Sequence, residues 1–461
     1  MGRKFGWLAG LLMMAMTVPA VAQAVSGLDG DWDGALSVTG GIKLRLSLHV
    51  ESHDGSTTAT LTSLDQGNAK IPAAAITRDG DVVSLDVPAL HAGFKGTLSR
   101  DGGTIDGTWA QGTPLPLSFA RRAAGAPAPA AMRRPQEPKP PFPYRSEDVR
   151  FAGPGGITLA GTLTMPEGTG PFPAVVLVQG SGPHDRDETM LGHKPFLVLA
   201  DALTRRGIAV LRTDKRGVGK STGDYAKADS NDFAADTEAS IAYLKSLKTI
   251  AAKKIGLIGH SEGGLIAPIV AAKDRSVAFI VLLAGPGLKG ADILRMQGRL
   301  IRQAMGASAE SLDRSEALNR KLSEIAIAAK DTDDARTQMM DALSAEGVPI
   351  ERAIATAGQL SSPWFRFFLS YDPAPTLSQV ECPVLALNGA LDLQVPPAED
   401  LAAIKSALAG HRDVTVKELP GLNHLFQTAK TGAPGEYGQI EETMAPAALA
   451  VIGDWVVQRT R

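Results

Sequence analysis

Apolar and polar residues alternate along residues 25–122, in short segments such as KLRLSLHV, TATLTSL and DVVSLDV. Turn-forming residues, among them DG, GG and RDGG, separate these segments. A period of two places the apolar side chains of a strand on one face, and frequent turns are typical of antiparallel sheets. We therefore predict a small antiparallel β domain over residues 25–122, built as a sandwich or a barrel.

The pattern changes at residue 146, where apolar runs of strand length begin to alternate with longer helical patterns. Runs such as AVVLVQG, IGLIG and VLALNG are continuously apolar, which is typical of strands buried on both faces. The alternation stops over residues 288–376, which are helix-like. We predict an α/β domain over residues 146–461, with a mostly parallel eight-stranded sheet, helices on both faces and a helical lid at 288–376.

A proline-rich stretch joins these two regions. Residues 123–145 read AAGAPAPAAMRRPQEPKPPFPYR and include seven prolines. Such a composition favours extended backbone and offers little apolar surface to bury. We interpret this stretch as an interdomain linker.

The first 24 residues have the pattern of a secretory signal peptide. Arg3 and Lys4 precede the apolar run WLAGLLMMAMTV, and AVA and AQA provide cleavage sites after residue 22 or 24. A membrane anchor is the alternative, but the run is shorter than the roughly 20 residues of a membrane span. We expect export to the periplasm or beyond it. The mature chain has no other long apolar stretch, so we expect no span in it.

Composition excludes several classes of partner. The 461 residues have a formal net charge of −2 and no basic patch, so we expect no nucleic acid partner. Cys382 is the only cysteine, so no disulfide can form within the chain, and we interpret it as a small buried residue. His49, His53 and His91 lack the spacing of metal ligands, and we expect neither a metal nor a cofactor.

Residues 217–222 read GVGKST and resemble a phosphate-binding loop. That motif needs glycine five residues before its second glycine, and this position is Asp214. A carboxylate there would repel phosphate, so we expect no nucleotide. We interpret RTDKRGVGKS as the loop after a sheet strand, in which Asp214 and Arg216 pair and stiffen the backbone.

The segment GHSEGG at 259–264 follows the strand-like run KKIGLI and precedes a helix-like run. G-x-S-x-G in this context is typical of a nucleophilic serine held on a sharp strand-to-helix turn. Ser261 is therefore the candidate nucleophile. The backbone N–H of Glu262 is then a candidate donor to the oxyanion that forms during acyl transfer.

A serine nucleophile needs a base, and the base needs a group to orient it. Two histidines follow the candidate serine. His424 comes just after the last predicted strand, where the base is expected, whereas His411 precedes that strand. Asp392 follows the run VLALNG and is the candidate acid. We prefer it to Asp372, at the end of the lid, and to Asp413, at the wrong end of a strand.

The loop VVLVQGSGPHDRDE follows the third predicted strand, and a second oxyanion donor is expected there. Gly180 allows a close turn, and the N–H of Ser181 is the candidate donor. Gln179 can brace the loop by a hydrogen bond. Residues 184–187 form either a polar mouth for the substrate or an ion-pair network that holds the loop.

The predicted lid ends in a dense aromatic patch, SSPWFRFFLSYDP. Its rings either pack within the lid or line a pocket for an acyl or aryl group. The residues of this possible pocket are Trp364, Phe365 and Phe368, with Phe367 beside them.

The segments QGSG, DKRGVGKS, GHSEGG, NGALDLQVPP and GLNHLF, in this order, resemble those of the α/β-hydrolase superfamily. Within it, the chain is similar to secreted or periplasmic bacterial serine carboxylesterases of the EstD type, several of which carry an N-terminal β domain. The resemblance implies hydrolysis of short-chain carboxylic esters without a metal. It places the triad on Ser261, Asp392 and His424, and the oxyanion donors on Ser181 and Glu262. Gln179 departs from the histidine of many relatives.

We therefore predict a serine esterase that acts on a small-molecule ester through an acyl-enzyme intermediate. One alternative is a serine aminopeptidase-like amide hydrolase, which would need lid carboxylates to hold an α-amino group. The available acids are Glu310, Glu316, Glu324 and Asp331. The other alternative is an envelope-binding protein in which the hydrolase domain is vestigial.

Overall fold

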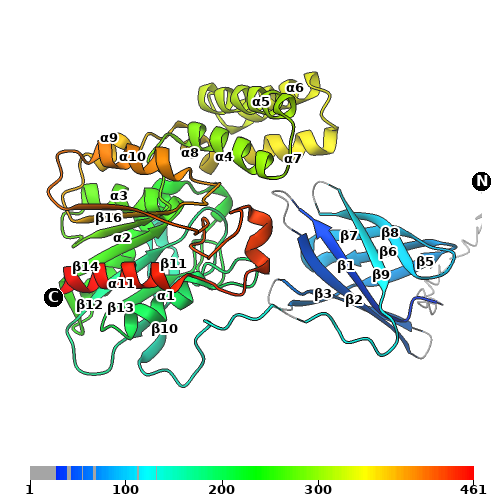
Figure 1. Ribbon diagram of the computed structural model, residues 1–461, viewed down its shortest axis with the longest axis horizontal. Helices are drawn as coiled ribbons and strands as arrows, with labels where there is room; N and C mark the ends of the chain where they lie inside the picture. Colours follow the sequence, from blue (N-terminus) through cyan, green and yellow to red (C-terminus); the bar gives the residue numbers. More distant parts are fainter. Residues whose placement is uncertain (1–26, 39–42, 54–55, 66–68, 112–113, 131) are drawn as a thin grey trace, which may run out of the picture.

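The computed structural model of the protein describes residues 27–461, except 39–42, 54–55, 66–68, 112–113 and 131. The predicted signal peptide, residues 1–24, lies outside the described residues. Two separate sheets dominate the fold (Figure 1). No helix within the described residues combines the length and the apolar character needed to cross a bilayer.

The N-terminal sheet is a single curled antiparallel sheet of nine strands, in the order β4-β3-β2-β1-β9-β8-β7-β6-β5 (Figure 1). Trp32, Phe94 and Phe119 are buried in its core. The alternating pattern did not reveal β4 and β5, because both are short and largely exposed. The strands are Gly30–Ser37 (β1), Lys43–His53 (β2), Ser56–Ser63 (β3), Ala69–Pro72 (β4), Ala75–Asp79 (β5), Val82–Val87 (β6), Ala92–Leu98 (β7), Thr104–Ala110 (β8) and Leu115–Arg121 (β9).

The C-terminal sheet has eight strands, in the order β10-β11-β13-β12-β14-β15-β16-β17. β10 and β11 are antiparallel to their neighbours, and the strands from β13 to β17 run parallel. The strands are Arg145–Ala152 (β10), Thr158–Met165 (β11), Phe172–Val178 (β12), Ala209–Thr213 (β13), Ile250–His260 (β14), Ile280–Leu283 (β15), Val384–Gly389 (β16) and Val414–Leu419 (β17).

Helices cover both faces of this sheet. Along β12, Val175 and Leu177 face a core shared with α1 and α11, whereas Val176 and Val178 face a core shared with α2, α3 and α10. Because both faces are buried, the strand is apolar at nearly every position. The helices are Pro195–Thr204 (α1), Ser230–Ser246 (α2), Glu262–Lys273 (α3), Pro397–Ala407 (α10) and Pro446–Thr460 (α11), with short 3₁₀ helices at Pro88–Leu90 (η2), Pro154–Gly156 (η3), Tyr225–Lys227 (η4) and Pro434–Gln439 (η5).

Between β15 and β16 the chain forms a cluster of helices that lies at the top of Figure 1 and that we call the lid. Its helices pack around a small core of their own, which includes Leu322, Met339 and Leu343. Serine or aspartate side chains cap three of the helices, at Ser308, Asp331 and Ser362. The helices are Gly290–Ala304 (α4), Ala309–Ala328 (α5), Thr332–Ala345 (α6), Ile350–Leu360 (α7), Pro363–Ser370 (α8) and Ala374–Leu377 (α9).

The linker is tied to the C-terminal region by polar side chains. The guanidinium of Arg134 donates to the carbonyls of Leu191, Gly438 and Ile440. Gln136 donates to the Met444 carbonyl, and its own amide oxygen accepts from two backbone N–H groups. Hydrogen bonds therefore hold the proline-rich linker, which has little apolar surface to bury, to the C-terminal region.

Asp400 on α10 anchors the start of the lid. It is fully buried, and its Oδ1 accepts hydrogen bonds from the backbone N–H groups of Gly287, at 2.7 Å, and Leu288, at 3.1 Å. Its Oδ2 has no hydrogen-bond partner in the part of the chain that the structure describes. Burial raises the pKa of this carboxyl to about 7.

We expect Asp400 to make stability depend on pH. Between pH of about 4 and about 7 the folded protein keeps a proton that the unfolded chain has released. The free energy of unfolding should therefore fall as pH rises through this window, by up to the order of 4 kcal/mol. Denaturant unfolding from pH 5 to 8 should show this fall in the wild type and a flatter profile in Asp400→Asn. Glu418→Gln, at an exposed position of β17, should keep the wild-type profile. Equal slopes for wild type and Asp400→Asn would contradict the assignment.

Candidate active site

The strand order of the C-terminal sheet reverses at β12, which has β13 on one side and β14 on the other. In open α/β sheets such a switch point opens a crevice at the carboxyl ends of the strands. The loops after β12, β14, β16 and β17 all leave this edge. They carry most of the residues that the sequence singles out.

Ser261 lies on a sharp turn between the end of β14 and the start of α3. Its φ of 51° and ψ of −117° are a strained combination for a residue with a side chain. A Cβ added at Gly259 would lie 1.9 Å from the Gly263 carbonyl oxygen, and one added at Gly263 would lie 1.9 Å from that of Val178. Both glycines are therefore required by close backbone packing, which holds the serine in its strained conformation.

Asp392 and His424 form a buried hydrogen-bonded pair. His424 Nδ1 lies 2.8 Å from Asp392 Oδ2, so the ring donates from Nδ1 and its Nε2 is the nitrogen left to accept a proton. Asp392 Oδ1 accepts from the backbone N–H groups of Gln394, at 2.7 Å, and Val395, at 2.9 Å. The carboxylate is thus fixed from both sides.

The turn that carries Ser261 contacts the loop that carries His424 through the preceding residue, His260. His260 Nε2 lies 3.1 Å from the His424 carbonyl oxygen, and the two imidazole rings are 4.9 Å apart. Among the described residues, no hydrogen bond joins the Ser261 hydroxyl to the His424 ring. The apo geometry of such pairs is often loose, so this does not argue against a proton transfer between them.

The other candidates for base and acid make local contacts elsewhere. His411 Nδ1 accepts from the backbone N–H of Asp413, whose carboxylate pairs with Arg459. Asp372 accepts from the N–H of Ala374 at the start of α9.

The loop after β12 presses against the turn of Ser261. A Cβ at Gly180 would lie 3.2 Å from Ser261 Cβ, so this position favours glycine. The backbone N–H groups of Ser181 and Glu262 have no hydrogen-bond partner within the described part of the chain. Ser181, Ser261 and Glu262 line the same cavity, of about 520 Å³.

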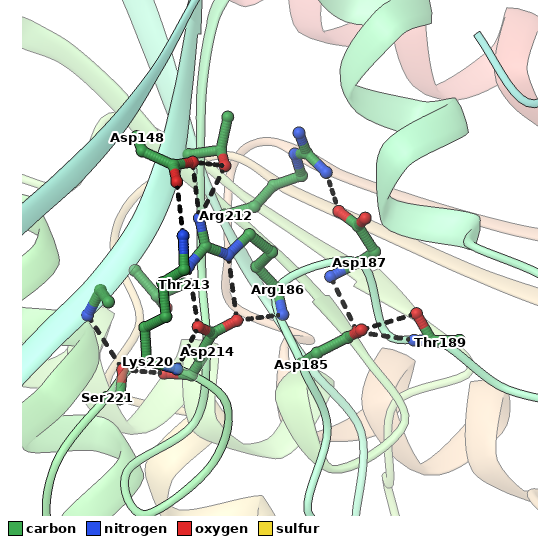
Figure 2. Close-up of polar contacts among 12 residues, drawn as sticks. Asp148, Asp185, Arg186, Asp187, Thr189, Arg212, Thr213, Asp214, Lys220 and Ser221 are labelled. Carbon is green, nitrogen blue, oxygen red and sulfur yellow. Dashed lines mark hydrogen bonds and ion pairs between the residues drawn. The ribbon is translucent and has the colours of Figure 1, made fainter. Parts of the chain in front are cut away.

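Ion pairs hold the loop after β12, as Figure 2 shows, and none of residues 184–187 lines the cavity of Ser261. Arg186 donates to both carboxylate oxygens of Asp214, at 2.8 and 3.0 Å, and also to Asp148. Asp187 pairs with the buried Arg212. His184 is separate from this network, and its ring lies 2.7 Å from the Ser181 carbonyl oxygen.

The predicted pairing of Asp214 with Arg216 is wrong. Asp214 faces Arg186 of the neighbouring loop, whereas Arg216 reaches α2 and pairs with Asp232 and Asp236. These two aspartates are four residues apart and therefore share one face of the helix. Sequence proximity suggested the pair, but the two side chains leave the loop in different directions.

Gln179 bridges the loops after β12 and β13. Its side-chain amide donates to the carbonyl oxygens of Asp185 and Thr213. Glutamine at this position therefore braces the loop through two backbone acceptors.

A buried ion pair, which sequence reasoning missed, joins Lys215 to the side chain of Glu262. Lys215 Nζ lies 3.0 Å from Glu262 Oε2 and donates to the Gly180 carbonyl at 2.7 Å. Glu262 Oε1 accepts from Ser230 Oγ at 2.7 Å and from the Trp364 indole at 2.6 Å. The sequence contained one signal for this ion pair: the acidic side chain of Glu262 inside GHSEGG, for which no partner was predicted.

A second buried pair, Glu188 and His260, lies beneath the same turn. Glu188 Oε1 accepts from the Gly180 N–H at 2.5 Å and lies 3.1 Å from His260 Nδ1. His260 faces an acceptor at each ring nitrogen, which favours the imidazolium. Burial lowers the pKa of His260, but the charge and hydrogen bond of Glu188 outweigh it and raise the pKa. For Glu188, burial raises the pKa, but the charge of His260 outweighs it and lowers the pKa. No motif in the sequence marks Glu188.

Lid aromatics cover the cavity. Trp364 stacks on Phe368, with ring centroids 5.2 Å apart, and meets Phe365 edge to face at 4.7 Å. All three line the cavity, so the rings pack on one another and form its wall. Phe367 turns aside and stacks on Tyr371.

Within the described residues, no group of three or more His, Cys, Asp or Glu side chains is arranged to hold a metal ion. Cys382 is partly buried against the sheet core, and burial raises the pKa of its thiol to about 12.

Comparison with known proteins gives a family. The sequence profile described as X-Pro dipeptidyl-peptidase (S15 family) matches residues 155–409, more than half of the chain. Esterase EstD of Thermotoga maritima is 26% identical over 322 residues, which are 69% of this chain and 69% of that protein. A putative carboxymethylenebutenolidase of Synechocystis sp. is 29% identical over 116 residues, 24% of this chain and 47% of that protein.

Solved structures with similar folds include the α/β hydrolase GrgF from Penicillium sp. sh18, with 20% identity and a TM-score of 0.43. The match covers 68% of this chain and 99% of that chain. The Pyrococcus furiosus esterase Pf2001 has 15% identity and a TM-score of 0.43, over 69% and 92% of the two chains. The profile match over more than half of the chain, together with the similarity to Esterase EstD, shows that the chain is a hydrolase enzyme and that it belongs to the X-Pro dipeptidyl-peptidase (S15) family.

Proposed function

We propose that the protein is a serine esterase that hydrolyses carboxylic esters through an acyl-enzyme intermediate. The observation that carries this proposal is the buried hydrogen bond from His424 to Asp392, next to a strained Ser261 that lines the cavity. Ser181 and Glu262, whose backbone N–H groups have no hydrogen-bond partner within the described residues, line that cavity too. Together they supply a nucleophile, an oriented base and donors for an oxyanion.

In the proposed reaction, His424 Nε2 takes the proton of the Ser261 hydroxyl as its oxygen attacks the ester carbonyl. The N–H groups of Ser181 and Glu262 stabilise the resulting oxyanion. His424 then gives the proton to the leaving alcohol. In the second half, His424 activates a water molecule that releases the carboxylic acid from the serine. Asp392 holds the ring and stabilises its charged form.

The two buried pairs orient the oxyanion loop. A peptide unit is planar, so the C=O of Gly180 and the N–H of Ser181 point in opposite directions. Lys215 binds that C=O, and Glu188 binds the Gly180 N–H. The direction of the Ser181 N–H is therefore set by the buried ammonium of Lys215 on the far side of its peptide unit, and Glu188 holds the preceding peptide unit. We assign Lys215 and Glu188 as positioning residues.

Esterase EstD is similar to this chain in sequence, which supports ester hydrolysis. The family description favours a second candidate, a dipeptidyl-peptidase. Such an enzyme would need a carboxylate near the serine to bind an α-amino group. Among the described residues that line the cavity, the only acid is Glu262, and Lys215, Ser230 and Trp364 occupy its oxygens.

The lid acids considered from the sequence do not supply that carboxylate. None of them lines the cavity of Ser261. Glu310 pairs with Arg314, Glu316 pairs with two lid arginines, and Asp331 caps α6. We therefore place the peptidase second. We also keep the proposal that residues 1–24 direct export to the periplasm or beyond it.

Replacing Ser261 by alanine should lower kcat/KM for p-nitrophenyl butyrate by at least about a thousandfold, because the nucleophile is lost. A fluorophosphonate probe should label the wild type and leave Ser261→Ala unlabelled. Ser181→Ala keeps its backbone N–H and should retain most of the activity. Wild-type turnover by Ser261→Ala would overturn the proposal.

Lys215→Met should lower the free energy of unfolding by about 3–5 kcal/mol, because it leaves the Glu262 carboxylate buried without its counter-charge. It should also lower kcat for p-nitrophenyl acetate by about 10- to 100-fold with little change in KM, since the oxyanion donors lose their alignment.

Lys220→Met is the matched control in the same loop, because Lys220 pairs with Asp148 at an exposed site. It should leave both quantities near the wild-type values. If Lys215→Met loses stability but keeps the wild-type kcat, then Lys215 has a structural role only and does not align the oxyanion donors.

Esters and amides with the same acyl group, assayed side by side, should separate the two candidate functions. The esterase proposal expects a p-nitrophenyl ester to be turned over at least about a hundredfold faster than an X-Pro p-nitroanilide. A preference for the X-Pro amide that vanishes when its α-amino group is blocked would favour the peptidase.

A further inference from the structure

One face of lid helix α4 carries an apolar stripe that is only partly covered: Leu294 and Ile301 are half-buried, and Met305 is exposed. Leu294, Gly298, Ile301 and Met305 follow one another at intervals of four, three and four residues, which places them in a row along the helix. This row lines a groove of about 830 Å³ between α4 and α5. Leu360, Phe365 and, from α5, Ile327 also line the groove.

The groove adjoins the cavity of Ser261. Leu294, Gln297 and Phe365 line both the cavity and the groove. From Leu294 to Met305 the helix advances about 16 Å, at 1.5 Å per residue. Because the two spaces share three wall residues, an acyl chain that leaves the cavity past Leu294 and Phe365 would enter the groove, along a path that starts at the candidate nucleophile and runs out along α4.

The groove leaves large apolar side chains uncovered. Met305 is 56% exposed and Ile327 is 47% exposed, and both lie at the groove. Exposed apolar surface that is gathered in one hollow is typical of a ligand-binding groove.

Several charged side chains also line the groove, but two of its arginines have their heads engaged. Arg295 pairs with Glu316, and Arg302 donates to Ser315 Oγ. Their aliphatic stems can then contribute apolar wall. Arg320 and Glu324 are exposed residues of α5 with opposite charges, so the groove presents no net field of one sign.

We propose that this groove binds the distal part of a linear medium- or long-chain acyl group whose ester carbonyl lies at Ser261. This rests on the proposed esterase function and names its substrate class. The occupant follows from the position of the groove, which shares three wall residues with the cavity of Ser261, and from its largely apolar lining. Water adds to the acyl-enzyme carbonyl, the bond to Ser261 breaks, and a fatty acid leaves with the serine proton restored.

The proposal departs from the short-chain preference that the family resemblance implies. A short acyl group would fill only the part of the path next to Ser261. Each methylene buried in the groove should raise kcat/KM by about fourfold until the apolar row is covered.

The test is an acyl series of p-nitrophenyl esters from acetate to dodecanoate, with the dodecanoate-to-acetate ratio of kcat/KM as the readout. Gly298→Leu fills the groove, and a Cβ there meets only Asn319 Nδ2, at 3.5 Å. Leucine also favours the helix more than glycine does, so folding is not threatened. Ile327→Asp places a charge on the opposite wall. Ile354→Asp is the matched control, an isoleucine of α7 that is 58% exposed and does not line the groove.

We expect the wild-type ratio to exceed one, and both groove variants to lower it by at least about tenfold. Ile354→Asp should leave the ratio unchanged. Dodecanoate binding to Ser261→Ala, measured by calorimetry, should weaken about tenfold when Gly298→Leu is added.

A wild-type kcat/KM that falls steadily beyond butyrate, with the same profile in every variant, would overturn the groove and leave the esterase proposal standing. A dimer that Ile327→Asp dissociates, with no change in chain-length preference, would also overturn it, since a second copy would then cover the groove. If the wild type hydrolyses no ester, the esterase proposal fails. In that case, dodecanoate binding to the wild type and to Gly298→Leu still tests whether the groove binds an acyl chain.

Discussion

The buried ion pair of Lys215 and Glu262 connects the three parts of the molecule that meet above the sheet. Lys215 reaches the loop after β12 at the Gly180 carbonyl, and Glu262 begins α3 beside the candidate nucleophile. The Trp364 indole of the lid donates to the same carboxylate. Burying two charges is costly unless every hydrogen bond is made, so the loop, the turn and the lid must keep one arrangement.

The same principle explains why the strained turn persists. The backbone packs closely around Ser261, since a Cβ at Gly259 or Gly263 would lie 1.9 Å from a carbonyl oxygen. The two peptide groups that meet at Gly180, in the loop that presses against Ser261, are held by the carboxylate of Glu188 and the ammonium of Lys215. In the proposed mechanism, close backbone packing and buried charges would thus preorganise the site.

Helix α4 of the lid packs on the sheet core and also lines both the cavity and the groove. Ile293 is buried in the sheet core and fastens the helix to the α/β region. Its neighbour Leu294 lines the cavity and the groove, and the row continues to Met305. A helix with apolar residues on two faces can pack with one and leave the other for an apolar ligand.

The sequence by itself determined the strands of the α/β region, the glycine-flanked serine turn and the loops that carry Asp392 and His424. Local periodicity and motif spacing record such features, because they depend on neighbouring residues. The catalytic roles remain predictions. Tertiary structure decided the partners: Asp214 binds Arg186 rather than Arg216, and the Glu262 side chain binds Lys215 and Trp364. These contacts join residues far apart in the chain, and side-chain direction within a loop leaves no periodic trace in the sequence.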